Sequence, residues 1–118
     1  MKPQYILIMG VIFWFSVSSA KAVNGFYFYT GNEIFQRCNS DIGTPDSVGC
    51  VGYVAGIADA LTLTNTICVP TDVSVVQVRD IVLKYLREHP ERRHYNASGL
   101  AATALVSAFP CGSNKALP

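Results

Sequence analysis

The chain has 118 residues, of which 50% are hydrophobic and 14% are charged, and its formal net charge is +1. This is the length of one domain, so a multidomain enzyme is excluded. The nearly balanced charge lacks the electrostatic footprint of a nucleic-acid-binding protein, and the apolar composition excludes intrinsic disorder. The composition is that of a small folded domain.

Residues 1–22 have the pattern of a secretory signal peptide. Lys2 precedes an apolar stretch at residues 5–15, and Ala20 and Ala22 flank Lys21 in a small-x-small cleavage site. As a helix the apolar stretch would be about 16 Å long, too short to cross a hydrocarbon core of roughly 30 Å. We therefore expect cleavage near Ala22 and an exported, soluble domain at residues 23–118, with no membrane attachment after cleavage.

The first two expected helices follow from caps and hydrophobic spacing. Thr30 and Glu33 form a capping-box pattern, which predicts a short helix that ends near Cys38. Residues 39–45 are rich in loop-forming residues. A second helix is expected at about residues 47–64. Its apolar residues extend around nearly the whole circumference, which predicts burial on most sides.

The third expected helix starts with a second capping-box pattern, Ser74 and Gln77. Its apolar residues are three or four apart, and it should stop at His89 because Pro90 disfavours helical geometry in the residue before it. The β-branched stretch at residues 73–78 also favours a strand, but its alternation is too short to outweigh the helical period.

Asn96 is expected to cap a fourth helix, which Pro110 ends. Its predicted buried face comprises Leu100, Ala101, Ala104, Leu105, Ala108 and Phe109. The sequence thus predicts an all-α fold, a small four-helix up-down domain.

The four cysteines lie beyond the predicted cleavage site, and an even number in a short exported domain indicates two disulfides. In an up-down arrangement, the end of the first helix and the start of the second share one pole. The ends of the second and fourth helices share the other. A Cys50–Cys68 bond would have to span about 27 Å, against the roughly 4.4–6.8 Å between Cα atoms that a disulfide requires. We therefore predict Cys38–Cys50 and Cys68–Cys111.

The sequence predicts no catalytic site, no metal site and no cofactor. His89 and His94 are separated by a proline turn, so they lack the one-face spacing of helical zinc ligands. No serine lies in a nucleophile elbow, and the cysteines are expected to be paired. The glycines do not form a phosphate-binding loop. These patterns do not indicate an enzyme.

Two features of the second helix require a structural explanation. Gly52, Gly56 and Ala60 are four residues apart, and we expect them to let a neighbouring helix approach closely; in a membrane the same pattern would be a dimerising face. Asp59 lies on the same apolar helix, where a carboxylate must be paired or hydrogen-bonded. We expect a structural partner such as Arg79.

Basic residues are concentrated between residues 79 and 93, which contain Arg79, Lys84, Arg87, Arg92 and Arg93. A helix C-terminus attracts cations through its dipole, which explains part of this cluster. With His89, His94 and Tyr95 the same residues also form an aromatic-edged surface of the kind that docks other proteins, because arginine and tyrosine are favoured in interfaces.

Four blocks of sequence resemble the Rap/Tai family of bacterial immunity proteins. They are FYTGNEI at residues 28–34 followed by Cys38, CVGYVAGIADA at 50–60 followed by CVP at 68–70, VLKYLREHPE at 82–91, and AFPC at 108–111. Their order and spacing cover nearly all of the predicted exported part. The shared positions are interpreted as structural, and those singled out are Gly31, Gly52, Tyr53, Gly56, Asp59, Tyr85 and Pro90.

The resemblance implies a periplasmic helical protein, often dimeric, that neutralises a peptidoglycan amidase effector of type VI secretion by occluding its active-site cleft. A protruding segment held at both ends loses little entropy on docking, and residues 89–95 are the candidate. The predicted partner-binding residues are His89, Glu91, Arg92, Arg93, His94 and Tyr95. The aromatic run before Thr30 and the Arg92–Arg93 pair are the expected source of specificity.

The alternative function is a periplasmic acid-stress chaperone or binding module of the HdeA type.

Overall fold

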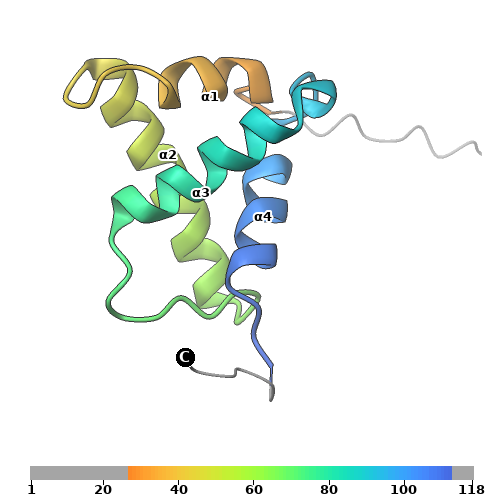
Figure 1. The fold of residues 1–118 in the computed structure, drawn as a ribbon. Coiled ribbons are helices and arrows are strands. Elements are labelled where there is room, and N and C mark those ends of the chain that lie inside the picture. The colour runs from red at the N-terminus through yellow and green to blue at the C-terminus, as the bar shows by residue number, and fades with distance from the viewer. Residues whose placement is uncertain (1–26, 113–118) are drawn as a thin grey trace, which may run out of the picture.

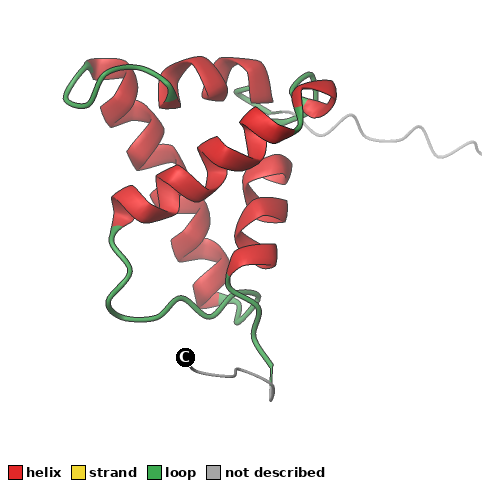
Figure 2. Ribbon diagram, in the orientation of Figure 1, coloured by secondary structure: helices red, strands yellow, loops and turns green. Residues whose placement is uncertain are grey.

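The computed structural model describes residues 27–112; the predicted signal peptide and residues 113–118 lie outside this range. The elements are α1 (Gly31–Cys38), α2 (Pro45–Leu63), α3 (Val75–Glu88), the short 3₁₀ helix η1 (Pro90–Arg92) and α4 (Ala97–Ala108) (Figure 1). Residues 27–112 contain no strand, only two isolated β-bridges (Figure 2). The all-α prediction is confirmed, and the third helix is a helix rather than a strand.

Helices α2, α3 and α4 alternate in direction, as the up-down prediction requires, and α3 crosses the other two (Figure 1). Helix α1 differs from that prediction because it lies across the end of the bundle where α2 and α4 begin. It is short, and both of its ends are tied down. Cys38 is bonded to Cys50 of α2, and Gly31 is hydrogen-bonded to the connection before α4. A helix held in this way covers one pole of the bundle instead of lengthening it.

The helix starts are fixed by side-chain caps, as expected. In the first capping box the Thr30 N–H donates to Glu33 Oε2 at 2.7 Å, and the Glu33 N–H donates to Thr30 Oγ1 at 3.3 Å. The Thr30 backbone and hydroxyl donors also lower the pKa of Glu33. The second capping box is present at the start of α3, and Asn96 caps α4.

Helix α2 begins at Pro45 rather than Ser47, because Thr44 is its N-cap and proline is favoured at the first helical position.

Both predicted disulfides are confirmed, with Cα–Cα distances of 5.1 Å for Cys38–Cys50 and 5.1 Å for Cys68–Cys111. The first joins α1 to α2 at one pole. The second joins Cys68, within the α2–α3 connection, to the chain after α4, and the Cys68 N–H also donates to the Phe109 carbonyl at 3.0 Å. Each pole of the bundle is therefore closed covalently.

The core lies where the four helices and the α2–α3 connection meet. Its largest fully buried side chains are Ile34, Ile67, Leu86, Leu105, Val54 and Val82. Four of the residues predicted for the inner face of α4 are buried: Leu100, Ala101, Ala104 and Leu105. Ala108 is exposed and Phe109 half-buried, because the helix ends there and Phe109 is its C-cap.

The prediction that α2 is buried on most sides is wrong. Only Ser47, Cys50, Val54 and Ala58 are buried, because α1, α3 and α4 pack along one side. Gly52, Gly56 and Ala60 are exposed, and a Cβ at either glycine would meet no atom within 4 Å. The small residues therefore do not admit a neighbouring helix of the same chain. By length and composition alone α2 could cross a membrane, although it packs against three other helices here.

The expected pairing of Asp59 with Arg79 is also wrong. Asp59 is exposed, so its carboxylate remains hydrated. Arg79 is buried on α3, where its guanidinium donates to the carbonyl oxygens of Cys38 and Ser40 and forms an ion pair with Asp80 at 3.2 Å. Arg79 thus ties α3 to the chain at the first disulfide.

Gly31 makes the closest packing contact of α1. A Cβ added there would lie 2.5 Å from Leu100 Cδ1 and 2.9 Å from both the Cα and carbonyl oxygen of Arg93. The leucine methyl can move, but the Arg93 backbone belongs to the η1–α4 connection and cannot move alone. Only glycine lets α1 approach this connection so closely.

We predict that Gly31→Ala lowers the free energy of unfolding by about 1–3 kcal/mol through overpacking. The matched control is Gly49→Ala within α2, where an added Cβ would meet only the flexible end of Arg37 at 3.4 Å, and it should raise stability by about 0.5–1 kcal/mol. Urea denaturation of both variants measures the difference. Equal effects of the two substitutions would contradict the close-contact role of Gly31.

Candidate protein-docking surface

The chain before α1 and the connection before α4 lie side by side at one end of the bundle. The Gly31 N–H donates to the Tyr95 carbonyl at 2.9 Å, and the Asn32 N–H donates to the Arg93 carbonyl at 2.7 Å. A third bond, from the Ala97 N–H to the Tyr29 carbonyl at 2.9 Å, completes the junction. Two segments that are distant in sequence are therefore held as one unit.

Exposed aromatic side chains from both segments meet the solvent at this junction. The exposed fractions are 79% for Phe28, 56% for Tyr95 and 48% for Tyr27. Exposed aromatic groups beside polar ones are typical of protein-binding sites. We define the end surface as Tyr27, Phe28, Glu91, Arg92, His94 and Tyr95, all of which are exposed.

The connection is ordered by its own contacts. Pro90 starts η1, directly after His89 has capped the end of α3. The ring centroids of His89 and Tyr85 are 4.4 Å apart, and His89 Nδ1 lies 3.1 Å from Glu91 Oε1. Hydrogen bonds to its own backbone N–H and to His89 lower the pKa of Glu91, so this carboxylate is ionised at neutral pH.

The two adjacent arginines have different roles. The Arg93 Nε donates to the Leu86 carbonyl at 2.7 Å, and its guanidinium lies 3.9 Å from the centroid of the Phe35 ring. Arg92 is exposed, and its side chain makes only longer contacts, 3.4 Å to Tyr85 Oη and 3.9 Å to Glu91 Oε1. Of the expected specificity pair, Arg92 is available to a partner, while Arg93 holds the connection onto α1 and α3.

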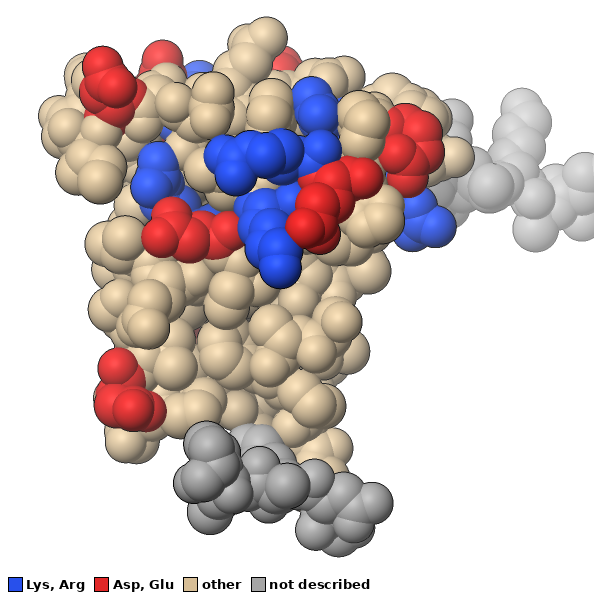
Figure 3. Space-filling model, in the orientation of Figure 1, with Lys and Arg blue, Asp and Glu red and all other residues tan. Residues whose placement is uncertain are grey.

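The basic cluster is smaller on the surface than the sequence indicated. Arg79 is buried and Arg93 is half-buried, which leaves Lys84, Arg87 and Arg92 exposed. In Figure 3 the basic side chains gather on the upper half of the molecule with acidic ones between them, and most of the lower half is uncharged. On this face, therefore, charges of both signs gather at the end where α1 lies, and the opposite end is nearly uncharged.

An edge-on pair of tyrosine rings packs the segment before α1 against α2. Tyr29 packs edge-on against Tyr53 of α2, with ring centroids 5.5 Å apart, and Arg37 lies 5.0 Å from the Tyr29 centroid. Burial raises the pKa of Tyr53, and a hydrogen bond with Ser98 of α4 opposes that rise. Tyr53, predicted to be structural, thus links α2 to the segment before α1 and to the first turn of α4.

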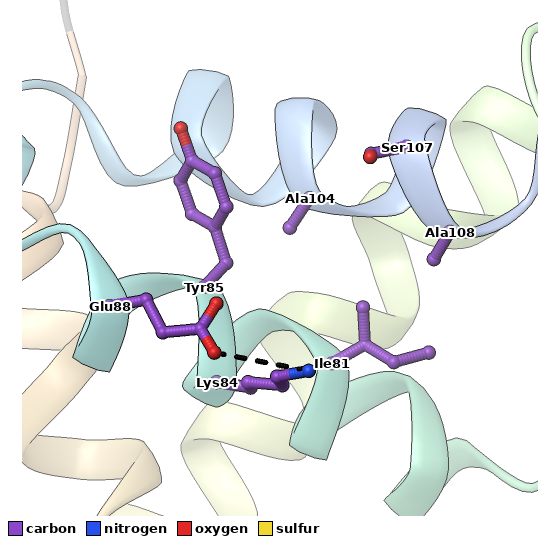
Figure 4. A pocket seen from close by; sticks show the side chains of 7 residues that line it. All are labelled: Ile81, Lys84, Tyr85, Glu88, Ala104, Ser107 and Ala108. Atoms are coloured by element: carbon purple, nitrogen blue, oxygen red, sulfur yellow. Dashed lines mark ion pairs between the residues drawn. The ribbon is translucent and has the colours of Figure 1, made fainter.

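A shallow groove lies between α3 and α4, near the connection (Figure 4). Lys84 and Glu88 form an ion pair at 3.8 Å along its α3 rim, while Tyr85 reaches toward the alanines of α4. Within residues 27–112 no group of three or more His, Cys, Asp or Glu side chains could hold a metal ion. His89 and His94 contact different partners, Tyr85 and Tyr95, and do not form a common site.

An ordered surface with exposed aromatic groups on a disulfide-closed helical bundle is typical of a protein-binding domain. The family model of the Rap1a immunity proteins matches residues 30–111, from the N-cap of α1 to the last cysteine. The chain therefore belongs to this family, and the match confirms the resemblance of its sequence blocks to the Rap/Tai immunity proteins. It is therefore an immunity protein against a type VI secretion effector, an inhibitor and not an enzyme, from a family whose members are typically periplasmic. No curated protein matches the chain.

We predict that Arg93→Ala destabilises the protein by about 1–3 kcal/mol, because it removes a charged hydrogen bond and a cation–π contact. Arg92→Ala, the neighbouring exposed position, should change stability by less than about 0.5 kcal/mol. Thermal and urea unfolding of the two variants test this division. A larger loss for Arg92→Ala would reverse the assigned roles.

Proposed function

We propose that this immunity protein is exported to the periplasm, binds a peptidoglycan amidase effector of type VI secretion and occludes its active-site cleft with the connection at residues 89–95. The family match and the predicted signal peptide support the location and the class of partner. The observation that carries the proposal is the junction of two chain segments, which presents exposed aromatic and basic groups on a backbone that is already fixed.

An ordered connection is suited to inhibition because little chain entropy remains to be lost on docking. The connection is held at one end by α3 and at the other by the backbone bonds from α1. Phe28 and Tyr95 provide apolar area, and aromatic anchors of this kind often carry much of an interface's binding energy. Arg92 provides a guanidinium that can donate two parallel hydrogen bonds to a carboxylate at the rim of a cleft.

Co-purification tests the partner directly. Tagged wild-type protein, recovered from the periplasm of a type VI-competent strain, should retain a peptidoglycan amidase that mass spectrometry identifies. The recovered effector should lose its hydrolytic activity toward peptidoglycan when the immunity protein is added in equimolar amount. An effector that stays active when bound, or the absence of any hydrolase partner, contradicts the proposed function.

Charge reversal at Arg92 tests the proposed surface. We expect Arg92→Glu to weaken binding of the recovered effector about 10-fold or more, since rim charges set complementarity and association rate. Arg87→Glu is the matched control because Arg87 is also exposed but lies on α3, outside the connection. Isothermal titration calorimetry should show weaker binding for the Arg92 variant only. The melting temperatures should show that both variants are folded. Unchanged affinity would place the contact elsewhere.

We further propose that the protein forms a homodimer through the exposed side of α2. This side presents Gly52, Gly56 and Ala60, and the helix leaves Val48 and Leu63 62% and 84% exposed. A second copy could approach closely over these small residues and bury Val48 and Leu63, while Asp59, exposed on the same side, stays hydrated at the edge of the contact.

Sedimentation equilibrium should give twice the chain mass for the wild type and for Thr103→Glu, an exposed position on α4. Gly56→Glu should give the single-chain mass, because it places a charge on the shared face. A monomeric wild-type protein rejects the dimer, and a dimeric Gly56→Glu variant rejects this face.

A further inference from the structure

The loop between α1 and α2, residues 39–44, carries Ile42 at its tip with 81% of the residue exposed. The loop projects at one end of α1, and the end surface lies at the other end of the same helix (Figure 1). Single exposed apolar residues are ordinary on protein surfaces. Ile42 differs because the backbone that presents it is fixed on both sides.

On the α1 side, the loop is anchored covalently and by a buried cation. Cys38, the last residue of α1, is bonded to Cys50 within α2, so the disulfide closes the loop at its base. The buried Arg79 of α3 donates to the carbonyl oxygens of Cys38 and Ser40. Both bonds come from Nη2, and Nη1 pairs with Asp80, while the buried Nε has no hydrogen-bond partner among the described residues.

On the α2 side, the loop closes through a short network of hydrogen bonds. The Thr44 N–H and Oγ1–H both donate to the Asp41 carbonyl, at 3.2 Å and 2.8 Å. The Ser47 Oγ, in a residue that is only 3% exposed, accepts from the Gly43 N–H at 3.0 Å. Gly43 has a φ of 91°, a conformation that glycine adopts without strain. The turn is thus organised before any partner arrives.

An isoleucine at this tip contributes almost nothing to folding, since its side chain stays in water. Tight turns favour small polar residues and glycine for their backbone geometry. A branched aliphatic group held out by an ordered backbone is instead suited to fill a pocket on another protein, because most of the ordering entropy has already been lost on folding. The exposed Asp41 beside it adds a negative charge to the tip.

We infer that Ile42 is a second anchor for the effector. Its side chain inserts into an apolar pocket of the effector, and a basic group at the border of that pocket faces Asp41. This inference rests on the proposed function. Helix α1 is about 12 Å long at 1.5 Å per residue, and a standard interface buries about 800 Å² on each partner. One partner can therefore contact the loop and the end surface together.

The test compares Ile42→Asp with Val106→Asp, using the effector recovered with the wild-type protein. Val106 is the control because it is an exposed aliphatic residue, 40% exposed, near the end of α4 and outside both proposed contact surfaces. Calorimetric titration should show about 10- to 100-fold weaker binding for Ile42→Asp, the range expected for losing one buried aliphatic anchor. Ile42→Val should retain most of the affinity, and melting temperatures should show that all three variants are folded.

The outcomes separate the two proposals. If wild-type protein binds the effector and Ile42→Asp binds as well as Val106→Asp, the anchor is rejected while the proposed function stands. Equal weakening by both aspartates also rejects it, because the effect would then not be specific to the loop. If wild-type protein binds no effector, the proposed function fails and the anchor fails with it.

Discussion

The arrangement of this protein depends on a close backbone approach that only a glycine permits. Because Gly31 lacks a side chain, the first turn of α1 lies against the backbone of Arg93 and donates its N–H to the Tyr95 carbonyl. That contact turns α1 across the pole of the bundle and places the aromatic residues 27–29 beside the connection before α4. The end surface exists because these two segments meet; neither would present the same set of side chains alone.

Local rules predicted most of the fold. Capping boxes fixed the starts of α1 and α3, proline marked the end of α3, and helix length together with alternating direction selected the disulfide pairing. The prediction for α2 failed because periodicity shows which residues are apolar, not how many neighbours are available to cover them. With α1, α3 and α4 packed along one side, Val48 and Leu63 remain in water.

The candidate site was only partly visible in the sequence. Residues 89–95 and the aromatic run were each identified, but their contact depends on backbone hydrogen bonds between distant segments, which leave no local pattern. Arg92 and Arg93 are chemically identical neighbours, and only the packing of Phe35 and the Leu86 carbonyl distinguishes their roles. No local pattern marks Ile42 either, because the rigidity of its loop depends partly on Arg79 from another helix.

The two disulfides pair the cysteines in consecutive order, with loops that neither interlock nor overlap along the chain. A polypeptide threaded N-terminus first through a translocon delivers Cys38 and Cys50 to the oxidant before the later pair emerges. An oxidase that joins thiols in order of arrival would then form both native bonds directly. On the proposed export route, this order of pairing would lead to the native bonds without reshuffling of a mispaired intermediate.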